Sequence, residues 1–154
     1  MAYQTTGTIT GMDVFQRAIT MMDELSDEGK YRYEDTDEYR NRTLAILNVL
    51  QGELYPYSDT YKKNSEWAKG RRPVLKPLDD LFSAIDLDDY CAGTVLPYGL
   101  AAALLLDENP TTANFFQQRY DELKASLMRG MPAESEDITD IYGGLYPYND
   151  MSRW

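Results

Sequence analysis

Apolar residues recur every three or four positions in four stretches of this chain, the spacing that gathers side chains on one face of a helix. The pattern predicts helices between Thr10 and Gly29, over 36–55, over 90–108 and over 110–129. Pro97 lies inside the third stretch, where a proline kinks or restarts a helix. The sequence therefore predicts a mainly α fold: a small bundle of about four helices, with a long loop or short hairpin insertion and an extended C-terminal tail.

The 154 residues are enough for one domain with its own core. Polar, Thr-rich residues 1–11 indicate a flexible N-terminal arm, and 12–130 the helical domain. Within that domain, the Pro- and Gly-punctuated stretch 56–77 is a basic loop, and 77–89 could hold a short strand or hairpin. Asp88 or Asp89 is expected to cap the next helix rather than bind a metal.

The third predicted helix is apolar on every side, which indicates burial on every side. Such burial occurs either at the centre of a domain or at an interface between subunits. The residues predicted to form this helical core or ring interface are Leu100, Ala103, Leu104 and Leu106.

The charge composition then makes some classes of function less favoured. Twenty-six acidic against fifteen basic residues leave a net charge of −11, which disfavours a general nucleic-acid binder. Six of the basic residues nevertheless fall within 62–76. This cluster is either a solvated loop or a positive finger for phosphates or an acidic partner. Trp67 is predicted first as a loop anchor, with a partner contact or base stacking as alternatives. The residues concerned are Lys62, Lys63, Trp67, Lys69, Arg71 and Arg72.

Candidate catalytic chemistry is sparse. The chain has no histidine and one cysteine, so it cannot build Ser–His–Asp or Cys–His catalysis or a zinc site of Cys and His ligands. Cys91 lies in an apolar-rich stretch and is predicted to be a buried, inert thiol. No phosphate-binding glycine motif is present. We expect no enzyme, no cofactor and no metal; the longest apolar run, 100–106, is also too short to span a membrane.

The C-terminal segment 131–154 combines early Pro, Glu, Ser and Asp with later tyrosines and a terminal Trp. Disordered segments are poorer in aromatics, so this composition favours an extended binding arm that becomes ordered on a partner. Docking back on its own domain is the alternative. The predicted binding residues are Ile138, Ile141, Tyr142, Gly143, Gly144, Leu145, Tyr146, Tyr148 and Trp154.

Four segments together resemble the head–tail connector (adaptor) proteins of tailed bacteriophages. They are DLDDY at 86–90 with VLPYGLAA at 95–102, LDEN at 106–109, and FFQQRYDEL at 115–123; DITDIYGG at 137–144 is similar to the tail of some phage and prophage members. The resemblance implies a structural virion protein of the neck, made in the host cytoplasm. It further implies a homo-oligomeric ring under the portal protein, about twelvefold if it follows portal symmetry.

On this resemblance, the C-terminal arm would clamp the portal, and the ring would line the channel through which genomic DNA passes without sequence specificity. The basic loop would project into that channel or toward the next stopper or tail protein. A tail-completion or stopper protein of the same neck is the first alternative. An acidic intracellular regulatory module, which mimics DNA, is the more distant one.

Overall fold

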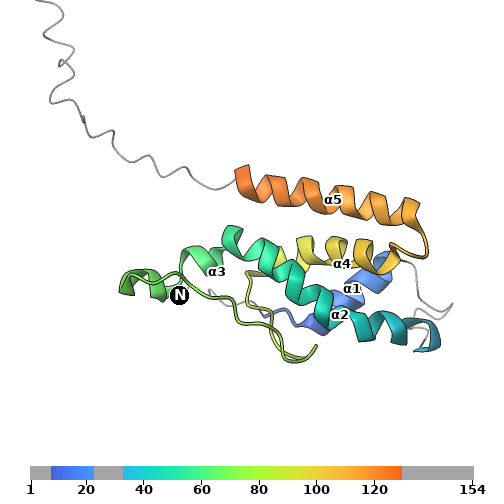
Figure 1. Ribbon diagram of the computed structural model, residues 1–154, viewed down its shortest axis with the longest axis horizontal. Coiled ribbons are helices and arrows are strands. Elements are labelled where there is room, and N and C mark those ends of the chain that lie inside the picture. Colours follow the sequence, from blue (N-terminus) through green and yellow to red (C-terminus); the bar gives the residue numbers. More distant parts are fainter. Residues whose placement is uncertain (1–7, 23–32, 130–154) are drawn as a thin grey trace, which may run out of the picture.

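The computed structural model describes residues 8–22 and 33–129. Their helices are α1 (Gly11–Met21), α2 (Tyr33–Leu54), the short α3 (Asp59–Lys62), α4 (Leu96–Leu105) and α5 (Pro110–Arg129). Figure 1 shows α4 between α5 on one side and α1 and α2 on the other. The predicted mainly α bundle is confirmed, with α4 as its central helix.

The helix boundaries follow from local hydrogen bonds. The Thr10 side chain accepts from the Asp13 backbone N–H while Asp13 accepts from the Thr10 N–H, a reciprocal capping box. Asn109 Oδ1 accepts from the Thr112 N–H at 3.2 Å, just before Pro110 opens α5. Pro56 follows the end of α2 and lies in a 3₁₀ turn. The predicted starts of α1 and α5 and the predicted end of α2 are confirmed.

Two predicted boundaries differ most from the structure, whereas the start of α2 and the end of α4 differ by three residues. Helix α1 ends at Met21, well before Gly29, and positions 23–32 lie outside the described residues. The arm predicted over 1–11 is too long, because its last residues pack on the domain. The Thr8 N–H donates to Asp89 Oδ1 at 2.9 Å, and the Ile9 carbonyl accepts from the Ile85 N–H at 2.9 Å.

The stretch after the basic loop contains no strand or hairpin among the described residues. Its single β contact is an isolated antiparallel bridge between Thr10 and Ala84. Two side chains of α2 attach the loop instead. Asn48 accepts from the Leu78 N–H at 2.8 Å and donates to the Leu78 carbonyl at 3.2 Å, and Gln51 Nε2 donates to the Lys76 carbonyl at 3.2 Å. The long-loop alternative therefore holds here, because the backbone of this stretch bonds to side chains of α2 and at isolated points to residues 9–12, without forming a strand.

Pro97 restarts the third predicted helix, as expected. A π-helix (η3, Cys91–Val95) precedes α4, and Pro97 occupies the first turn of α4. Proline has no N–H to donate to the carbonyl four residues earlier, and its ring crowds that carbonyl. The wider turn of the π-helix makes room for the proline ring beside that carbonyl. Asp88 caps the start of this helical stretch by accepting from the Cys91 N–H at 3.3 Å, so it does the capping predicted for it.

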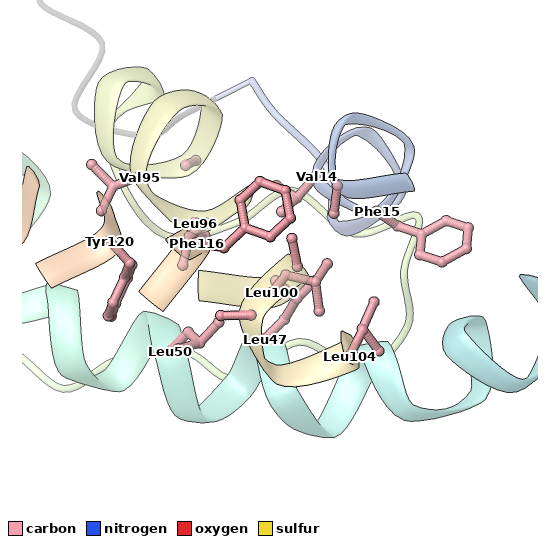
Figure 2. Packing of buried hydrophobic residues seen from close by; sticks show 14 of the residues in the cluster. Val14, Phe15, Leu47, Leu50, Val95, Leu96, Leu100, Leu104, Phe116 and Tyr120 are labelled. Carbon is pink, nitrogen blue, oxygen red and sulfur yellow. The ribbon is translucent and has the colours of Figure 1, made fainter. Parts of the chain in front are cut away.

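The core lies where α4 meets the other long helices. Leu96, Leu100 and Leu104 of α4 have no exposed surface, and they pack with residues from α1, α2 and α5. Figure 2 shows Leu47, Leu50, Phe116 and Tyr120 among the residues of this cluster. The stripe predicted on α5 is buried at Ala113, Phe116, Tyr120 and Leu123, and partly buried at Leu127.

Candidate interaction site

The basic loop forms a compact projection that we call the basic finger, residues 59–76. It contains α3, a 3₁₀ segment (η2, Ser65–Lys69) and the extended residues that follow. Figure 1 shows α3 and the following green segment at one end of the long axis of the molecule. The finger is therefore held away from the centre of the bundle.

Three aromatic rings attach the finger to the end of α2. Tyr55 and Tyr61 meet edge to face with ring centroids 5.2 Å apart, and Tyr61 and Trp67 do the same at 5.3 Å. Trp67 Nε1 also donates to the Tyr61 carbonyl at 2.8 Å. Such pairs add stability beyond the area they bury. Trp67 thus anchors the loop, although 44% of its surface remains exposed.

Local caps set the path of the finger. The Ser58 side chain accepts from the Tyr61 N–H and caps α3, and Asn64 accepts from the Glu66 N–H and caps η2. Gly70 then turns the chain with φ of +70°, a conformation that side chains disfavour. The finger is consequently an ordered projection with its own hydrogen bonds.

The finger carries six Lys or Arg against two acidic residues, a net charge of +4, so the rest of the chain carries −15. Glu66 contacts Lys69 at 3.2 Å and Arg71 at 3.0 Å, and Arg72 Nε donates to the Tyr61 hydroxyl at 3.1 Å. These are exposed contacts that salt screens easily. The positive surface is therefore held in place and still available to a partner.

The opposite end of the molecule is acidic. The turn between α4 and α5 presents Leu106, Asp107 and Glu108, and the nearby start of α2 presents Asp37 and Glu38, all exposed. Because the Tyr39 hydroxyl donates to Glu108, these two segments are adjacent. We call these five exposed residues the acidic end.

The apolar helix was predicted to be buried either in the centre of the domain or at an interface between subunits, and its residues differ in this respect. Leu100 and Leu104 belong to the core of the chain itself, and Ala103 is half-buried. Leu106 follows the last helical residue and is 59% exposed. The prediction of core for Leu106 is wrong, because it lies beyond the part of α4 that α1, α2 and α5 cover. Only Leu106 among the four keeps a large surface for another subunit.

A groove between α1 and the π-helix was not anticipated. It measures about 520 Å³ and includes Arg17, Gly93 and Tyr98 in its lining. Arg17 donates to the Gly93 carbonyl at 2.8 Å. That carbonyl lies four residues before Pro97, which cannot donate to it. The Gly–Pro spacing was the available sequence signal, and Arg17, 76 residues away, could not be paired with it from sequence.

The described residues show no metal-binding group of three or more His, Cys, Asp or Glu side chains. Cys91 is 1% exposed, and burial, with Asp88 nearby, raises the pKa of its thiol. A thiol in this state is a poor nucleophile, so the predicted inert Cys91 is supported. Among the described helices, none is long and apolar enough to cross a bilayer.

We expect the free energy of unfolding to fall at alkaline pH. Burial, and then the hydrogen bond to Glu53 at 2.8 Å, raise the pKa of Tyr120 above its ordinary value of 10.0. Burial likewise raises the pKa of Cys91 above 9.0. Folding thus favours the protonated forms of Tyr120 and Cys91. The stability that these two groups contribute is fully present below their ordinary pKa values and is lost as the pH rises above them. Urea denaturation at pH 8 and pH 10.5 should show a lower free energy of unfolding at the higher pH.

Tyr120→Phe should reduce that loss, and Tyr90→Phe, at a half-exposed ring, should leave it unchanged. An identical alkaline loss in both variants would contradict the role of Tyr120.

The predicted portal-binding arm, with Ile138 through Trp154, lies outside the described residues. The structure thus brings the basic loop into one ordered finger. Of the four residues predicted for the core or ring interface, it buries Leu100 and Leu104 and exposes Leu106.

Comparison of the chain with protein-family models, curated proteins and solved structures finds no match.

Proposed function

We propose that this chain is a structural subunit of the neck of a tailed phage, forming a ring under the portal that joins head to tail and lines the DNA channel. The support is the connector-like sequence of 86–123 together with its place in the fold. This segment runs from the Asp88 cap through α4 and the Asn109 cap into α5. It therefore includes the central helix and most of α5, the helix that packs against it most extensively, so the resemblance concerns the framework of the domain.

The charge distribution is consistent with this function. An acidic body repels a DNA duplex that must slide past without binding, because like charges oppose adsorption. The basic finger is confined to one end, where it is available to a protein partner or to phosphates.

Quantitative mass spectrometry of purified particles, from the virus whose genome encodes this chain, tests the proposal. We expect a copy number close to that of the portal protein, about twelve if the ring follows portal symmetry. A much larger number would contradict the neck and indicate tail tube or capsid. Absence from the particle would overturn the structural role and favour the acidic regulatory module.

A further inference from the structure

We propose that copies of this chain associate head to tail, with the basic finger of one copy on the acidic end of the next. This inference deepens the proposed ring function and rests on it for its biological setting. The contact itself follows from the charges, exposed apolar residues and positions of the two ends.

The two surfaces are complementary in charge. The finger has a net charge of +4 within a chain of −11. The acidic end exposes four carboxylates, Asp37, Glu38, Asp107 and Glu108. The neighbouring Arg42 is directed inward, where it donates to the Leu104 carbonyl at 3.2 Å and lies 5.8 Å from the centre of the Tyr39 ring. Arg40 is exposed near these carboxylates, but its single positive charge leaves the acidic end with a net negative charge.

Each surface also contains apolar area to bury. Val74 is 86% exposed and Trp67 44% exposed on the finger, and Leu106 is 59% exposed at the acidic end. Aromatic and aliphatic anchors inside a charged rim are the usual composition of a protein interface. Trp67 is held by its hydrogen bond to Tyr61, so little side-chain freedom would be lost when it binds.

The positions of the two surfaces limit how copies can meet. Figure 1 shows the finger and the α4–α5 turn at opposite ends of the long axis. Repulsion between like charges disfavours contacts of finger with finger or of acidic end with acidic end. Contact of a finger with an acidic end can form in two ways. An antiparallel twofold pair makes it twice and stops at two copies, whereas copies placed end to end make a heterologous interface that closes into a ring or continues as a chain. The proposed ring requires the end-to-end arrangement, and covalent oligomers beyond the dimer distinguish it from the pair.

Cysteine cross-linking of the full chain tests the contact. Ala68 of the finger and Leu106 are both exposed, and the native Cys91 is buried. We would treat Ala68→Cys, Leu106→Cys and the double variant with a short bismaleimide at high protein concentration and low salt. The double variant should give a ladder of covalent oligomers, and 0.5 M NaCl should strongly reduce it, because salt screens the attraction. Dimers from either single variant, or no ladder from the double variant, would overturn the proposal.

Charge reversal provides an independent test that does not depend on the position of a cross-link. One variant carries Arg71→Glu and Arg72→Glu, and the other Asp37→Lys, Glu38→Lys and Asp107→Lys. Circular dichroism would verify that both are folded. Each alone should sediment as a smaller species than an equimolar mixture, because only the mixture pairs opposite charges. A mixture that sediments like its components would overturn the proposal.

The two proposals can fail separately. A chain present in the particle at the portal ratio, but without the ladder, would retain the neck function and exclude this contact. A chain that forms the ladder but is absent from particles would retain the contact and exclude the neck.

Discussion

Replacing Leu100 by alanine is expected to lower the free energy of unfolding by about 2–5 kcal/mol. Leu100 has no exposed surface, and Figure 2 shows it among Leu47, Leu104 and Phe116 in the core. Because helices pack on both sides of α4, the surroundings cannot collapse fully into the space left by the side chain. Urea denaturation followed by circular dichroism measures the change.

Leu106→Ala is the matched control, with the same substitution six residues further along. Leu106 is 59% exposed, so its loss should change the free energy of unfolding by less than about 0.5 kcal/mol. Its effect is expected in the oligomeric state instead. A small loss of stability in Leu100→Ala would show that α4 is not the centre of the isolated domain and that its apolar surface is buried mainly between subunits.

Adding one methyl group at Gly99 should be the second large perturbation. A Cβ atom there would lie 2.9 Å from the Tyr120 ring and 3.1 Å from Leu50 Cδ1. Tyr120 is 2% exposed and its hydroxyl donates to Glu53, so the ring has little room to move. Overpacking of this kind costs about 1–3 kcal/mol, which exceeds the gain in helix propensity from glycine to alanine. We therefore expect Gly99→Ala to lower the melting temperature.

Gly52→Ala is the same change on an exposed face of α2. Among the described residues, its Cβ would have only Leu75 Cδ2, at 4.0 Å, as a neighbour. With nothing to displace, the alanine should stabilise the domain by about 0.5–1 kcal/mol. Thermal unfolding should therefore shift in opposite directions for the two variants. A stabilised Gly99→Ala would mean that α4 and α5 do not approach as closely as described.

The sequence predicted best what depends on neighbours within about four residues. The helix starts at Thr10 and Pro110, the restart at Pro97 and the buried stripe of α5 all follow from hydrogen bonds or periodicity along one segment. The same reasoning placed the end of the first helix too late, because Gly29 is a plausible stop but does not determine where tertiary contacts cease to support a helix. Val49 is an apolar residue of the helix predicted over 36–55, yet it is 64% exposed, because none of the described elements covers that side of α2.

The candidate site was visible only in part. The concentration of Lys and Arg over 62–76 identified a basic loop, and Trp67 was assigned as its anchor, since composition shows what a segment contains. Composition did not show that Tyr55, Tyr61 and Trp67 meet edge to face in one ordered finger, or that the finger and the acidic end lie at opposite ends of the molecule. The aromatic contacts depend on the turns between three residues that are each six positions apart, and the placement of the two ends joins residues that are far apart in the sequence.

The sequence by itself thus determined the helical class, most helix limits, the acidic net charge and the poverty of catalytic groups, because these depend on local geometry and composition. The tertiary structure alone decided that Leu100 is core and Leu106 surface, that Asn48 holds Leu78 thirty residues away, and that Arg17 satisfies the Gly93 carbonyl. The physical reason is common to all three. Burial and long-range hydrogen bonding depend on which elements come together in space, and a helical period specifies a face without specifying what will cover it.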